Sequence, residues 1–110
     1  MADFRTLFRQ LRDRRGMQGV PPGLTGAVVF MLACDAATDR QLFDGFSEWI
    51  NLRRGGDGRT SLAWFGEIVA SVLDGDVAGR VPYWNLGSDE AAVVERELFD
   101  VVDKFLSEQN

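Results

Sequence analysis

The spacing of apolar residues predicts an amphipathic helix near the start of the chain. These residues recur there at intervals of three and four positions: Phe4, Leu7, Phe8 and Leu11. Positions three and four apart share one face of an α-helix, so this face is expected to meet a core. Gly16 and the proline- and glycine-rich residues 19–23 do not continue a helix. The pattern therefore predicts a basic amphipathic helix over residues 3–15.

The apolar run at residues 27–34 fits either a buried helix or a buried strand, because it has no period that separates the two. Alanines in and after the run favour a helix, whereas Val28-Val29-Phe30 favours a strand. No second segment is typical of a partner strand, and a lone strand leaves its backbone polar groups unpaired. We therefore expect a helix, which Thr25 is placed to cap.

A third helix is predicted to begin at Thr38 or Asp39. Its apolar face holds phenylalanine, tryptophan, leucine and isoleucine, and Asn51 lies on the opposite, polar side. The stretch ends with two arginines followed by Gly55 and Gly56. Cations in the last turn followed by glycine are typical of a helix end.

A fourth helix is predicted over residues 61–74, with Thr60 or Ser61 as its cap. Its polar residues form one narrow stripe that includes Glu67, and apolar side chains cover the rest of its surface. A helix that is apolar nearly all round is normally buried. We therefore expect helix 61–74 at the centre of the fold.

The last helix is predicted over residues 88–108 and is acidic. Ser88 is a suitable cap, and Asp89 and Glu90 stabilise the positive end of the helix dipole. Two apolar stripes follow, while the exposed remainder is mostly carboxylate. Taken together, the segments predict a compact all-α bundle of four to five helices in a single domain over residues 1–110.

Composition restricts the environment and the chemistry. The 110 residues include one cysteine, Cys34, and no histidine. One cysteine forms no internal disulfide and no apolar run is long enough to span a bilayer, so we expect a cytoplasmic protein without a membrane span. Histidine is the commonest general base and a common zinc ligand. We therefore predict no metal, no cofactor and no enzyme activity, with Cys34 as a buried structural residue.

An enzyme is the least favoured functional alternative, and paired carboxylates are the catalytic groups that remain for it. Asp74 with Asp76, or Asp100 with Asp103, can supply an acid, a base or oxygen ligands for a metal ion. The first pair falls at a predicted helix end and the second on the exposed face of the last helix. Carboxylates in such positions usually interact with solvent.

Charge is distributed unevenly along the chain, whose net charge is −5. The first twenty residues hold five arginines against two aspartates, a local charge of +3, and the other ninety carry −8. The acidic part repels phosphate backbones, which argues against nucleic acid as a partner. It attracts a basic protein, although charge on a small domain also serves solubility alone.

The segment 81–86 holds the residues most typical of a binding surface. Tyr83 and Trp84 offer large, rigid contact areas with polar tips. Acidic residues flank them: Asp74, Asp76, Asp89 and Glu90. This combination predicts a small protein-binding module for a basic protein partner, in its sharpest form an inhibitor or immunity protein for a nuclease toxin. The alternative is that Trp84 folds back on the bundle.

The arginines of the first helix define the other functional alternative. Arg5, Arg9 and Arg12 lie on one face at helical spacing. Such a face fits a regulatory helical protein that associates with nucleic acid, although no helix-turn-helix signature follows it. The same arginines can instead be solvated or pair with the acidic last helix.

Three segments resemble a group of small uncharacterised actinobacterial proteins. They are residues 11–17, residues 43–49 with the Gly45-Phe46-Ser47-Glu48-Trp49 sequence, and residues 97–106. In that group an arginine-glycine-methionine segment precedes a GF-x-EW helix, and a LF-x-LL-x-x-FL helix closes the chain. The resemblance implies an all-α fold and no particular activity.

Overall fold

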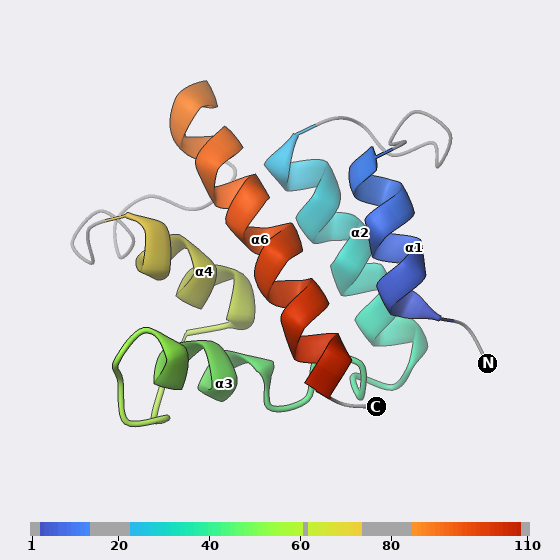
Figure 1. The fold of residues 1–110 in the computed structure, drawn as a ribbon, viewed down its shortest axis with the longest axis horizontal. Coiled ribbons are helices and arrows are strands. Elements are labelled where there is room, and N and C mark those ends of the chain that lie inside the picture. Colours follow the sequence, from blue (N-terminus) through green and yellow to red (C-terminus); the bar gives the residue numbers. More distant parts are fainter. Residues whose placement is uncertain (1–2, 14–22, 61, 74–84, 109–110) are drawn as a thin grey trace.

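The computed structural model describes residues 3–13, 23–60, 62–73 and 85–108, which contain helices and no strand (Figure 1). The helices are α1 (Phe4–Asp13), α2 (Leu24–Ala37), α3 (Phe46–Arg53), α4 (Trp64–Val72) and α6 (Ser88–Glu108). The predicted all-α class is therefore confirmed. The apolar run that fitted a helix or a strand is helical as part of α2.

The centre of the fold is α6, which is 21 residues long and packs closely against each of the other four helices. Figure 1 shows it crossing the molecule, with α1 and α2 on one side and α3 and α4 on the other. The expectation that helix 61–74 is central is wrong, because among the described helices α4 packs closely only against α3 and α6. The two apolar stripes of α6 give it two sides to bury, whereas Phe65 and Val72 of α4 stay partly exposed.

Aromatic rings form much of the core between these helices. Phe46 is fully buried, and its ring centroid lies 4.5 Å from that of Phe105 on α6 and 5.2 Å from that of Phe43. Phe43 in turn lies 4.9 Å from Trp64 and stacks on Phe8 of α1. Ring pairs at such distances add to the stabilisation that burial provides. The aromatic cluster therefore connects α1, α3, α4 and α6.

Residues 38–45 form a turn, so the prediction that the third helix begins at Thr38 or Asp39 is wrong. Asp39 and Arg40 have φ values of 55° and 62°, in the left-handed region. The hydroxyl of Thr38 accepts a hydrogen bond from the Leu42 amide, and the Asp35 carboxylate accepts one from the Phe43 amide. Local side-chain bonds of this kind compete with helix formation. The helix starts only at Phe46, after Gly45.

The predicted caps of two other helices are also wrong. The residue before α2 is Gly23, and no side chain caps that helix, so Thr25 does not serve. Helix α4 follows Ala63. The Thr60 hydroxyl instead accepts a bond from the Leu62 amide and donates one to Glu67. The predicted bounds 88–108 of the last helix are confirmed.

Candidate functional site

Two arginines of α1 bind one carboxylate of α6. The Nε atoms of Arg5 and Arg9 each lie 2.9 Å from Oδ1 of Asp103, and their Nη2 atoms each lie 3.2 Å from Oδ2. Hydrogen bonds from Arg5, and then from Arg9, lower the pKa of Asp103 to about 2. Arg12 pairs with Asp13 at 3.0 Å. The first helix therefore packs on the acidic last helix, and Asp103 is not a solvated carboxylate.

A polar cluster lies between α3 and α4, on the polar side predicted for the third helix and the polar stripe predicted for the fourth. Glu67 is 0% exposed and Asn51 is also buried, so these polar residues face each other inside the fold and not solvent. Nε of Arg54 lies 2.6 Å from one oxygen of Glu67, while the Thr60 hydroxyl and the Asn51 amide donate to the other. The helical period places these residues correctly on their helices but does not show the cation that approaches from another element.

The cluster also holds the glycine-rich turn after α3. The side-chain oxygen of Asn51 accepts the Gly58 amide at 2.9 Å, and its backbone oxygen accepts the Gly56 amide at 2.8 Å. Burial raises the pKa of Glu67, but the bonds from Arg54, Thr60 and Asn51 outweigh it and the pKa is lowered. Every oxygen of Glu67 has a protein donor, so the carboxylate serves structure and does not offer a base for catalysis.

Exposed and half-exposed carboxylates gather on the side of α6 away from α1 and α2, which we call the outer face of α6. Its members recur at helical spacing and include one arginine: Asp89, Glu90, Val93, Arg96, Glu97 and Asp100. Asp100 pairs with Lys104 at 3.1 Å, whereas Asp89, Glu90 and Glu97 have no cationic partner in the described part of the chain. Val93, at the middle of this face, is 47% exposed. The face therefore carries four carboxylates and one guanidinium around an apolar centre.

The predicted binding residues lie only partly within this surface. Asp89 and Glu90 are exposed in the first turn of α6, next to each other on its outer face. Tyr83, Trp84, Asp74 and Asp76 lie outside the described residues. Val93 and Glu97 were not among the predicted binding residues, although Val93 lies four positions after Asp89 and Glu97 lies seven positions after Glu90.

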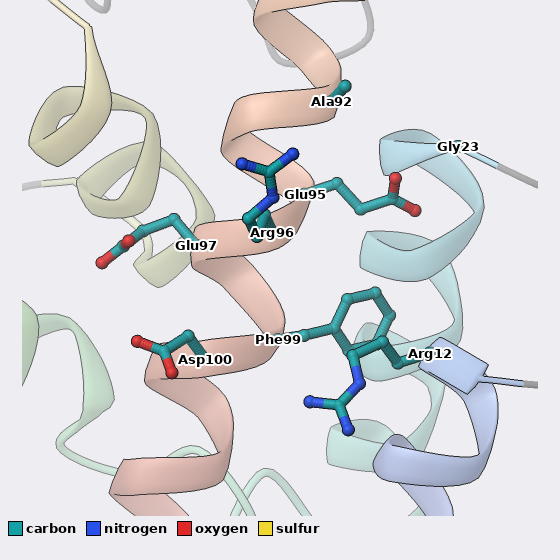
Figure 2. A pocket seen from close by; sticks show the side chains of 8 residues that line it. All are labelled: Arg12, Gly23, Ala92, Glu95, Arg96, Glu97, Phe99 and Asp100. Atoms are coloured by element: carbon teal, nitrogen blue, oxygen red, sulfur yellow. The ribbon is translucent and has the colours of Figure 1, made fainter.

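A surface hollow of about 790 Å³ borders the same helix (Figure 2). It is lined by Arg12, Gly23, Ala92, Glu95, Arg96, Glu97, Phe99 and Asp100. Figure 2 shows Glu97 and Asp100 on the side of α6 toward α4, while Glu95 and Phe99 are directed toward α1 and α2. The lining therefore mixes two guanidinium groups with three carboxylates and selects no single sign of charge.

The described residues offer little to a metal or a nucleophile. No group of three or more carboxylate or cysteine side chains among them is arranged to hold a metal ion. Cys34 is partly buried, and burial raises the pKa of its thiol, so the reactive thiolate is disfavoured. No helix in the described ranges is long and apolar enough to cross a membrane.

Comparison of the chain with family models, curated proteins and solved structures finds no match in any of the three.

Proposed function

We propose that the protein is a binding module that docks a basic protein partner on the outer face of α6. The observation that carries this proposal is the set of three carboxylates there, Asp89, Glu90 and Glu97, that have no cationic partner among the described residues. They surround Val93, which is about half exposed. An apolar centre with a charged rim is the usual arrangement of a protein interface. The rim charges favour and orient approach of a positively charged surface.

The pairing of Arg5 and Arg9 with Asp103 weighs against the alternative of a nucleic-acid-associated protein. Phosphate binding depends on cations that are free to displace counterions. Two of the three arginines on that face already share a carboxylate within the fold, and Arg12 pairs with Asp13. The net charge of −5 adds long-range repulsion of polyanions.

The finer form of the proposal is an inhibitor or immunity protein for a basic partner such as a nuclease toxin. Proteins that bind nucleic acid present cationic surfaces because their substrate is a polyanion. A small acidic domain that covers such a surface competes with the substrate directly. Asp89 and Glu90 then belong to the contact together with Tyr83 and Trp84, which precede α6 in the chain.

The test captures basic proteins from a lysate of the source cells on the immobilised chain, in parallel with two charge-reversal variants. Glu97→Lys changes the middle of the outer face of α6. Glu108→Lys is the matched control, because it makes the same change on the same helix at an exposed position beyond this face. We expect one basic protein to be retained by the parent and by Glu108→Lys but lost by Glu97→Lys.

Retention should also fall as salt rises from about 50 to about 300 mM, since screening weakens contacts between exposed charges. Circular dichroism verifies that both variants fold. A partner retained equally by all three proteins would show that binding does not use the outer face of α6. Retention of nucleic acid with a steep salt dependence would return the arginines of α1 to consideration.

A further inference from the structure

The hollow beside α6 is large enough for a ligand and is built by three elements. Its volume is about 790 Å³, which lies within the range of ligand-binding clefts. Arg12 comes from the end of α1, Gly23 directly precedes α2, and the other lining residues belong to α6 (Figure 2). A Cβ atom on Gly23 would meet no atom within 4 Å, so the chain does not close the hollow at that residue.

Two of the charged side chains that line the hollow have no ionic partner. Arg96 is exposed, and Glu97 next to it is half-exposed. Neither side chain forms a hydrogen bond or an ion pair within the described part of the chain. The other charged lining residues are engaged in the fold: Arg12 with Asp13 at 3.0 Å, Asp100 with Lys104 at 3.1 Å, and Glu95. The hollow therefore offers one free cation beside one free anion.

A ligand with a single sign of charge does not match this pair. A purely cationic ligand next to Glu97 also approaches Arg96 and Arg12, and the repulsion between like charges lowers its affinity. A purely anionic ligand is repelled in the same way by Glu97, Glu95 and Asp100. A ligand that carries a carboxylate beside an ammonium or guanidinium group pairs with both Arg96 and Glu97. The charges of the hollow therefore select a ligand of mixed charge.

The size and position of the hollow favour a peptide segment as this ligand. Clefts of about 300–1,000 Å³ hold drug-sized ligands, which are comparable to a short peptide and larger than one amino acid. In an extended peptide, alternate side chains lie on the same side, about 7 Å apart, so both charges can face one surface. Glu97 and Asp100 belong both to the hollow and to the outer face of α6. A protein docked on that face therefore has its chain next to the hollow.

We propose that the hollow binds a peptide segment of the basic partner in which a carboxylate lies two positions from a lysine or arginine. Arg96 binds the carboxylate, with the Arg12 guanidinium in the same lining, and Glu97 binds the cation. The source of the segment rests on the proposed function, whereas its chemistry follows from the hollow alone. A uniformly basic surface then binds less tightly than one that carries an acid among its cations, which makes the site specific.

Three short peptides, titrated into the isotope-labelled full chain and followed by NMR, test this assignment. Their sequences are Lys-Ala-Glu-Ala-Lys, Lys-Ala-Lys-Ala-Lys and Glu-Ala-Glu-Ala-Glu, with acetylated and amidated ends. The net charge of −5 by itself favours the all-lysine peptide. We expect the mixed peptide to bind most tightly instead, with a dissociation constant on the order of 1 mM and at least about threefold below the others. The amide signals of Ala92, Arg96 and Glu97 should shift.

Two charge-reversal variants separate a local pairing from a general effect of charge. Arg96→Glu removes the free cation of the hollow, and Arg59→Glu makes the same change at an exposed arginine after α3 and is the control. We expect Arg96→Glu to reverse the order, so that the all-lysine peptide binds at least about threefold more tightly than the mixed one. Arg59→Glu should keep the order of the parent. If circular dichroism shows that Arg96→Glu is unfolded, Arg96→Gln replaces it and should abolish the preference for the mixed peptide.

The inference and the proposed function fail on different results. A parent chain that binds the all-lysine peptide as tightly as the mixed one would overturn the inference and leave the proposed basic partner intact. Amide shifts confined to residues outside the hollow would also overturn it, as would no binding of the mixed peptide up to about 10 mM. The proposed function fails separately, if Glu97→Lys captures the basic protein as well as the parent does.

Discussion

Removing Arg54 is expected to destabilise the protein more than neutralising Glu67, although Arg54 is the more exposed of the two. The Glu67 side chain is 0% exposed and the Arg54 side chain 35%. In Arg54→Met the buried carboxylate keeps its bonds from Thr60 and Asn51 but loses its cation. Breaking a buried ion pair by removing one partner costs about 3–5 kcal/mol. Because solvent reaches the Arg54 side, we expect a loss at the low end of this range, about 3 kcal/mol.

Glu67→Gln removes the charge and keeps the shape. Its amide oxygen still accepts from Thr60 and Asn51, and the freed guanidinium of Arg54 can turn to solvent. The loss is then one hydrogen bond between charged groups, and because Arg54 is partly exposed we expect the low end of the usual range, about 1.5 kcal/mol. The assay is urea unfolding at pH 7, followed by tryptophan fluorescence and circular dichroism. The control is Arg53→Met, which removes the neighbouring arginine. The Arg53 guanidinium lies 4.9 Å from the Trp49 ring centre, so this variant should lose about 1 kcal/mol or less of stability.

The pH dependence of the stability difference between Arg54→Met and the parent provides an independent test. In the parent, the pKa of Glu67 is below its ordinary value of 4.5, so its contribution is present above that pH and is lost as pH falls through the folded-state pKa. In Arg54→Met the uncompensated carboxylate has a raised pKa, so acid stabilises that variant relative to the parent. The stability difference should shrink between pH 7 and pH 4. A smaller loss for Arg54→Met than for Glu67→Gln, or a difference that grows in acid, would refute the reasoning.

Three further predictions concern other parts of the molecule. Asp103→Asn should lower the free energy of unfolding by about 1 kcal/mol at pH 7, because the arginines that bind Asp103 are partly exposed. In urea unfolding this difference should disappear as pH falls from 3.8 toward 2, because Asp103 itself is then protonated in the parent. Arg40→Gly should stabilise the fold by up to about 1 kcal/mol in thermal unfolding, because glycine adopts the left-handed conformation without strain; a destabilised variant would show that the Arg40 side chain makes a needed contact. Trp84→Ala should weaken capture of the basic partner while leaving the circular dichroism spectrum unchanged, and loss of the fold would place Trp84 in the core.

The sequence predicted the helices with a strong apolar period and missed the features that depend on distant partners. The bounds of α6 follow from its two apolar stripes and the acidic residues of its first turn, so local residues sufficed, although Ser88 is the first residue of the helix and not its cap. The start of α3 did not follow, because the turn before it depends on Asp35, eight positions before the amide that it accepts. Glu67 was placed on a polar stripe because periodicity counts a carboxylate as exposed, and only the tertiary fold brings Arg54 to it.

The candidate surface was predictable to a similar extent. Asp89 and Glu90 are exposed as their position in a first helical turn implies. The pairing of Arg5 and Arg9 with Asp103 was one of several alternatives, because residues 98 and 94 positions apart share no local pattern. The central position of α6 was missed for a related reason. Composition shows how apolar a helix is, but not how many neighbours the topology gives it.

The contact between Asp103 and the arginines of α1 can form only after the residues between them have been synthesised. Helix α1 is made before α6, which is its main packing partner, and 94 positions separate Arg9 from Asp103. At about 5–20 residues per second, the ribosome needs roughly 5–20 s to add that stretch. During this interval Phe8 and Leu11, which are buried in the finished fold, lack the helix that covers them. The apolar face of α1 therefore stays uncovered by α6 until the last helix has been made.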